Sequence, residues 1–188
     1  MRDLNEKAKQ AKEKKAALGP DIDLTTFDAE PVGIPRLDSP SQLPEKDRER
    51  MLQAGVDASE EGRSGTYIQK DTAVVYSHSS QDGLLVLPIN QALEEHQWAR
   101  DYYWKLVNVD ADKYTAGAQL NLHDGYVIRA LPGSRVFLPV QACLYLDRNN
   151  ISQYVHNLII AEEDSELHVI TGCATSPHLK RGLHVGIS

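Results

Sequence analysis

The chain has 188 residues, of which 41% are hydrophobic and 25% are charged, and its net charge is −7. This balance is typical of a soluble protein with one main domain, and the acidic charge argues against a nucleic-acid partner. No apolar run approaches the roughly 18 residues of a membrane span, and the N-terminus lacks the apolar stretch of a signal peptide. We therefore predict a cytoplasmic protein that binds neither nucleic acid nor membrane. Its two cysteines, Cys143 and Cys173, are too few for a disulfide framework and are expected to remain thiols.

Residues 1–65 are predicted to be a helical and linker region. Residues 3–17 are rich in Lys, Glu, Ala and Gln, which favour a solvated helix, and Gly19-Pro20 supplies a stop signal. Residues 21–44 are acidic and carry closely spaced prolines, so we interpret them as a linker. A second short helix is expected from residue 44 to residue 54, with Gly55 as its left-handed cap.

Residues 66–124 predict a small α+β region. The runs TYIQ, TAVVYS and GLLVLPI are typical of strands. Asn90 is expected to cap one continuous helix over QALEEHQWARDYYWKL, in which Trp98, Tyr102 and Leu106 recur every four residues. We interpret this aromatic stripe as core or interface, and not as a cofactor site.

Residues 125–188 are almost entirely strand-like. The segment 127–130 reaches a small polar turn and then a new alternating run, and the segment 159–162 does the same. Such paired strands suit a stacked β-solenoid, although an antiparallel sandwich or a cupin-like barrel gives a similar pattern. The run 184–188 stops inside an alternating strand, so we expect further chain to continue this sheet.

One constellation could carry chemistry. The sequence has no phosphate loop, Rossmann glycine pattern, zincin motif or nucleophile elbow, so the chain is not predicted to be an enzyme by itself. His168, Cys173, His178 and His184 lie within seventeen residues around a predicted turn at 171–177. A thiol at such a turn is accessible, and a nearby imidazolium lowers its pKa, as a persulfide acceptor or soft-metal ligand requires.

Other interpretations of these residues stay open. Cys173 could be a small residue that packs a turn, in a purely structural interaction module. A cupin-like metal protein could instead bring His168, His178 and His184 together on one ion, although the spacing matches no zinc pattern. Cys143 lies in the apolar strand VQACLYL, where inert burial is expected.

Four short motifs give the C-terminal half a family resemblance. These are the PVQA strand at 139–142, the segment HNLIIAEE at 156–163, the run GCAT at 172–175 with Pro177, and GLH at 182–184. Together they resemble the β-helix entry of SufB/SufD proteins, most of all the short archaeal forms. The resemblance covers residues 105–188 well and residues 50–104 loosely.

The resemblance implies a fold and a function. The fold would be mainly β: a partial right-handed parallel β-helix, with its first turns in 125–188, preceded by an α+β region with short helices. The chain would be the N-terminal portion of a non-enzymatic scaffold for iron–sulfur cluster assembly, truncated before the later turns. By the same resemblance, Cys173 would occupy the position that accepts persulfide sulfur in SufB.

The implied partners are a SufC-type ATPase, a SufB/SufD-type partner or a second copy, and a cysteine desulfurase system. An iron–sulfur cluster would be built in the complete complex, and no cofactor is expected for this chain alone. The sequence does not separate a SufB role from a SufD role.

Overall fold

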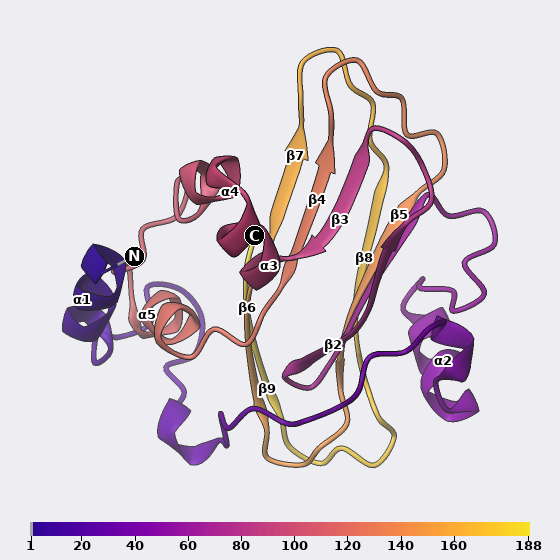
Figure 1. Cartoon of the computed structure of the whole chain (residues 1–188). Helices are drawn as coiled ribbons and strands as arrows, with labels where there is room; N and C mark the ends of the chain where they lie inside the picture. The colour runs from indigo at the N-terminus through magenta and orange to yellow at the C-terminus, as the bar shows by residue number, and fades with distance from the viewer. Residues whose placement is uncertain (1) are drawn as a thin grey trace.

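A computed structural model describes residues 2–188, with mixed helix and strand content (Figure 1). The helices are α1 (Arg2–Ala11), α2 (Glu45–Gln53), α3 (Ile89–Glu95), α4 (Gln97–Tyr102) and α5 (Lys113–Leu120), with 3-10 turns at Leu24–Thr26 and Pro40–Gln42. The strands are β1 (Gly65–Lys70), β2 (Ala73–Ser79), β3 (Leu84–Pro88), β4 (Tyr126–Ala130), β5 (Val140–Leu146), β6 (Ser152–His156), β7 (Leu158–Ala161), β8 (Val169–Thr175) and β9 (Leu183–Ile187).

The last six strands make two similar passes through the fold. The first pass is β4, β5 and β6, and the second is β7, β8 and β9. Each strand of the second pass lies parallel to its counterpart in the first, so β4 pairs with β7, β5 with β8 and β6 with β9. A bridge between Arg135 and Glu166 joins the two polar connections in the same register. The weak repeat predicted from the sequence, 127–130 with 159–162, is therefore present in the backbone pairing, but one residue earlier, as 127–130 with 158–161.

The earlier strands extend the sheets that these passes form. β1 pairs with β2 antiparallel and with β5 parallel, while β3 pairs antiparallel with β4. The resulting sheets have the strand orders β2-β1-β5-β8, β3-β4-β7 and β6-β9. None of the sheets formed by residues 2–188 closes into a barrel. Strands from residues 66–124 and 125–188 thus share sheets.

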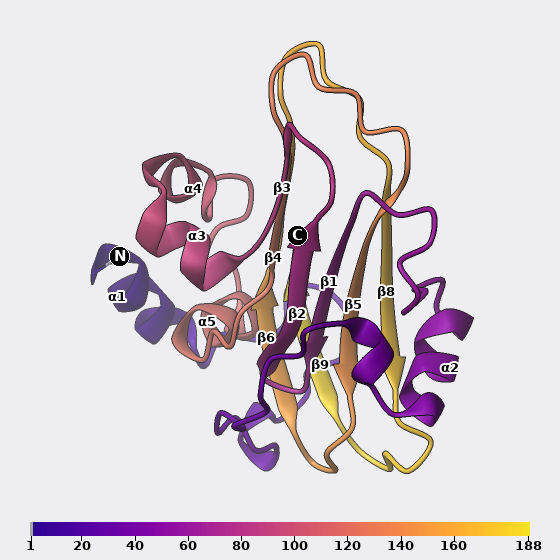
Figure 2. The same cartoon turned by 45° about the vertical axis from the view of Figure 1, so that its right-hand side comes forward.

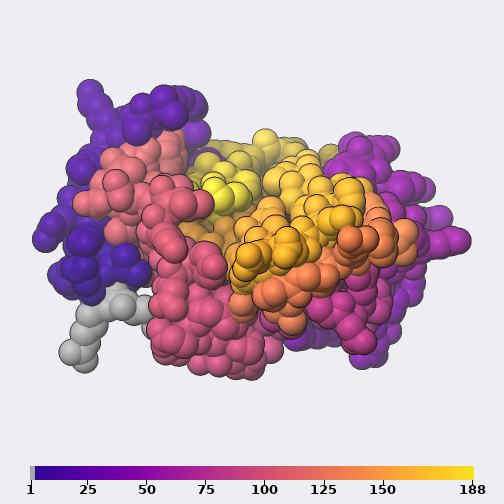
Figure 3. Space-filling view, turned by 90° about the horizontal axis from the view of Figure 1, so that it is seen from above, coloured from indigo at the N-terminus to yellow at the C-terminus, as the bar shows by residue number. Residues whose placement is uncertain are grey.

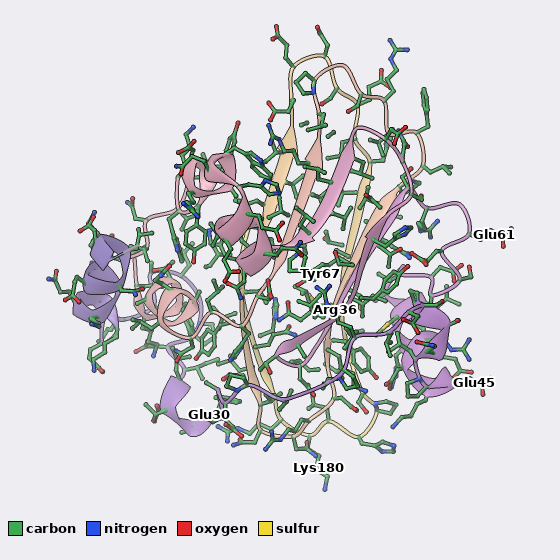
Figure 4. All side chains as sticks on the ribbon, in the orientation of Figure 1. Glu30, Arg36, Glu45, Glu61, Tyr67 and Lys180 are labelled. Atoms are coloured by element: carbon green, nitrogen blue, oxygen red, sulfur yellow. The ribbon has the colours of Figure 1, made fainter. Side chains whose placement is uncertain are left out.

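Apolar side chains fill the space between the sheets. Tyr67 of β1, labelled in Figure 4, is fully buried there and meets Tyr126 of β4 edge to face, with ring centroids 5.6 Å apart. Ala142 and Leu144 of β5 belong to the same cluster, so one face of β5 points inward. Alternate residues of a strand point to opposite sides, and Cys143 accordingly points outward.

Helices cover two outer flanks of the strands. Figure 1 shows α1, α3, α4 and α5 on one side and α2 on the other, and Figure 2 shows α2 beside β8. On the first side, Leu183 and Val185 of β9 belong to the core cluster that includes residues of α1, α3 and α5. Under α2, Met51 packs in one cluster with Cys143 and Tyr145. Seen from above in Figure 3, the C-terminal segments cross the molecule between these flanks.

The continuous helix predicted over residues 91–106 is wrong. α3 ends at Glu95 and α4 begins at Gln97, because His96 is extended with φ −126° and ψ 121°. The Arg100 side chain donates to the carbonyl oxygens of Leu93, at 2.6 Å, and Glu94, at 3.0 Å. The guanidinium thereby satisfies the carbonyls that end α3, so the chain can turn there.

Asn90 lies inside α3 and is not its cap. Its side-chain amide donates to the carbonyl oxygen of His123, 3.0 Å away. The expected helix therefore also begins differently from the prediction, with Pro88 at its N-cap.

The segment at 21–44 is bound to the strands along much of its length. The Asp28 backbone bridges to Ile151, and the Ser152 amide donates to the Asp28 carbonyl oxygen at 2.8 Å. Further along, the Leu37 amide donates to the Val75 carbonyl oxygen, also at 2.8 Å. The proline-rich stretch interpreted as a linker is thus a strap across the outside of the strands.

Of two other helices, α2 was predicted from local sequence signals and α5 was not. The predicted short helix is present as α2, and Gly55 has the expected left-handed backbone, with φ +86°. α5 was not predicted, although Asp112 and Thr115 form a capping box at its start. No helix within residues 2–188 is long and apolar enough to cross a membrane.

Candidate functional site

Cys173 lies within strand β8 and not at a turn, which corrects the sequence prediction. β8 pairs with β5 as far as Thr175, and Cys173 lies beside Leu144 in that register. Gly172 therefore does not end the strand. A Cβ at Gly172 would lie 2.6 Å from the carbonyl oxygen of Ala54, so glycine is needed where the end of α2 approaches β8.

The register also sets the direction of the Cys173 side chain. Neighbouring residues in a parallel pair point to the same side of the sheet, and Leu144 belongs to the inner cluster. Cys173 therefore points to the inner side, and it is exposed because β8 is the last strand of its sheet in the part of the chain described. It lines a crevice of about 380 Å³ together with His184, Tyr126 and Thr171.

The electrostatic setting of Cys173 differs from the expectation. Partial burial raises the pKa of its thiol, and no histidine contributes to the shift. The predicted lowering by a nearby imidazolium is therefore wrong. Burial and the nearby Cys173 also raise the pKa of the Tyr126 hydroxyl to about 12. Cys173 is consequently protonated at neutral pH, and attack on sulfur requires removal of that proton.

The three candidate histidines occupy different surroundings. His168 precedes β8 and is exposed, and His178 is exposed in the connection after β8. His184 lies in β9, half-buried, and burial lowers the pKa of its imidazole. Among residues 2–188, no group of three or more His, Cys, Asp and Glu side chains is placed to hold a metal ion. The structure thus offers no support for the cupin-like interpretation.

The second thiol is sealed away from solvent. Cys143 is 0% exposed, packed against Met51 and Val56 beneath α2. Burial raises the pKa of its thiol to about 12. The inert burial predicted for Cys143 is confirmed, and the two thiols are chemically distinct.

Sequence reasoning missed Gln153, which orients His184. Gln153 is fully buried in β6, and its side-chain oxygen lies 2.8 Å from Nδ1 of His184. The two residues are neighbours in the parallel pairing of β6 with β9. Only the approximate repeat of the two passes, aligned strand by strand, could have paired them from the sequence.

These features define a class: a protein of stacked parallel strands with one accessible thiol on an inward face. No protein-family model matches the chain. An iron–sulfur cluster assembly SufBD family protein of Methanothermobacter thermautotrophicus (strain Winter) is 43% identical over 196 residues, covering 100% of this chain and 47% of that protein. A SufBD family protein of strain Delta H is 42% identical over 193 residues, with the same coverage. Iron–sulfur cluster assembly protein SufB of Bacillus subtilis (strain 168) is 24% identical over 152 residues, covering 78% of this chain and 33% of SufB.

The chain is therefore homologous over its whole length to archaeal SufBD family proteins, and the resemblance seen in its motifs is confirmed. It spans about half the length of the curated relatives that it matches.

Proposed function

We propose that the chain is part of a scaffold for iron–sulfur cluster assembly, in which Cys173 accepts sulfur. The observation that carries this proposal is the contrast between the two thiols. Cys173 is exposed and lines a crevice on the inward face, whereas Cys143 is sealed beneath α2. The names of the relatives, which are cluster assembly proteins, support the same function.

We also propose that the two passes of strands are the first turns of a right-handed parallel β-helix. The parallel pairing of all three strands in each pass supports this fold. The right hand follows from the strong preference of parallel crossover connections for that handedness. In such a coil, Cys173 points into the interior of the second turn.

The chain would act as a scaffold and not as an enzyme. ATP hydrolysis would reside in a SufC-type partner, and sulfur would come from a cysteine desulfurase system. A SufB/SufD-type partner or a second copy would complete the assembly, and the cluster would be its product. We place this complex in the cytoplasm, as the sequence predicts. These properties are proposed for the whole protein, since the chain spans about half the length of its curated relatives.

The test is sulfur loading followed by intact-mass spectrometry. The chain is incubated with a cysteine desulfurase and cysteine, and wild type is compared with Cys173→Ser and with Cys143→Ser as the matched control. We expect one added sulfur in wild type and in Cys143→Ser, and none in Cys173→Ser. Equal loading of Cys173→Ser would refute the assignment. So would the absence of any adduct on wild-type chain whose fold is intact by circular dichroism.

A further inference from the structure

Cys173 shares its crevice with one imidazole. His184 comes from β9 and Cys173 from β8, yet both line the same space of about 380 Å³. Leu183 and Val185 lie on the opposite face of β9, because they belong to the core cluster that packs against the helices. Alternation along the strand therefore turns His184 inward, as it does Cys173.

The hydrogen bonds of Gln153 fix the tautomer of this imidazole. The Gln153 side-chain nitrogen donates to the carbonyl oxygen of Asp71, which orients the amide and leaves its oxygen for Nδ1 of His184, 2.8 Å away. An amide oxygen only accepts, so Nδ1 carries the proton. Nε2 of neutral His184 is then left with a free lone pair.

A glycine two residues further along β9 leaves space for Nε2 of His184. A Cβ at Gly186 would lie 2.8 Å from Nε2 of His184, so the glycine leaves room for the ring. Gly186 lines the crevice as well. Burial lowers the pKa of His184, which keeps the imidazole neutral and able to take up a proton at pH 7. A buried orienting group, a neutral base and a thiol are the parts that activate a nucleophile.

We propose that Nε2 of His184 accepts the Cys173 proton when Cys173 takes up sulfur. This inference rests on the proposed function. Cys173 Sγ loses its proton to Nε2 and attacks the terminal sulfur of a donor persulfide. A new S–S bond forms at Cys173 as the donor's S–S bond breaks, and the leaving thiolate takes the proton back from His184. The donor persulfide is reduced to a thiol, and the Cys173 thiol is oxidised to a persulfide.

The test measures thiol activation without any sulfur donor. Iodoacetamide alkylation of Cys173 is followed by intact mass from pH 5.5 to pH 9 in wild type, His184→Gln and the control His178→Gln, whose exposed imidazole does not line the crevice. The other titratable side chain at the crevice is the Tyr126 hydroxyl, whose pKa of about 12 keeps it neutral over this range.

Wild type and His178→Gln should reach a plateau once the imidazole is neutral. The rate for His184→Gln should instead follow the thiolate fraction, rising about tenfold per pH unit, and should be at least about tenfold lower at pH 7. Superimposable profiles for wild type and His184→Gln would overturn the proposal.

A second variant separates a proton acceptor from a structural role. In His184→Ala, imidazole added to the buffer should restore the plateau, since it can occupy the vacated space. A slow rate that imidazole leaves unchanged, with the wild-type pH dependence retained, would mean that His184 only shapes the crevice. A profile that depends on His184 in a chain that takes no sulfur from the desulfurase would overturn the proposed function and leave this thiol–imidazole pair intact.

Discussion

Replacing Lys70 with methionine should destabilise the chain by removing a charge from a buried network. The Lys70 ammonium lies 2.8 Å from a carboxylate oxygen of Asp47 and 2.8 Å from one of Asp147. The Asp47 side chain is 0% exposed, and the Tyr145 hydroxyl donates to its other oxygen at 2.8 Å. Without Lys70, one hydrogen bond would remain for a carboxylate that solvent does not reach.

The expected loss is about 3–5 kcal/mol, the usual effect of removing one partner from a buried ion pair. For a chain of this size, that corresponds to a fall in Tm of roughly 6–20 °C. The network ties Asp47 of α2 to β1 and β5, so α2 should open more readily as well. Urea unfolding at pH 7, followed by circular dichroism, measures the free energy. Alkylation of Cys143, which lies beneath α2, reports the opening.

Two comparisons make this prediction refutable. Lys7→Met removes a pair with Asp3 whose side chains are 50% and 78% exposed, so its free energy of unfolding should stay close to that of wild type. Asp47→Asn combined with Lys70→Met should be more stable than Lys70→Met alone, because no charge is then left buried. A loss below about 1 kcal/mol for Lys70→Met, or no recovery in the double variant, would contradict the reasoning.

Two further predictions concern the close contact at Gly172 and the pH dependence that His156 causes. Gly172→Ala should cost about 1–3 kcal/mol, because its Cβ would meet the Ala54 carbonyl oxygen, whereas Gly33→Ala, with open space around it, should be near neutral in the same urea titration. Burial lowers the pKa of His156 from 6.5 to about 4. Between pH 6.5 and pH 4 the imidazole is therefore protonated in the unfolded chain and neutral in the folded chain, so the free energy of unfolding falls as the pH falls. His156→Leu should therefore flatten the decline in Tm from pH 6.5 to pH 4, and an unchanged decline would show that other groups cause it.

The positions of the strands, and the presence of a weak repeat among the C-terminal ones, could be predicted from the local sequence pattern. The runs that become β1, β2 and β3 are short, apolar and bounded by turn residues, and backbone preference is enough to place them. The same holds for α2 and the left-handed Gly55, which proline and glycine fix within a few residues. The buried character of Cys143 also followed from its apolar strand.

Features decided by contacts between distant residues could not be predicted. The break between α3 and α4 depends on where the Arg100 side chain finds acceptors, and a stripe of apolar residues does not encode that choice. The strap near Asp28 needs the backbone of β6 as a partner. The pairing of Gln153 with His184 needs the register of two strands.

For the site, the sequence by itself offered candidates, one thiol and three imidazoles, because it places Cys173 and three histidines close together along the chain. Its motifs also indicated the resemblance to SufBD family proteins, which the 42–43% identity over the whole chain confirms. The tertiary structure decided the rest. Pairing of β8 with β5 turned Cys173 inward, and burial raised the pKa of its thiol where the sequence had indicated a lower value. The reason is physical: which face of a strand is covered, and how far its side chains are desolvated, depends on the strands that pair with it and pack against it.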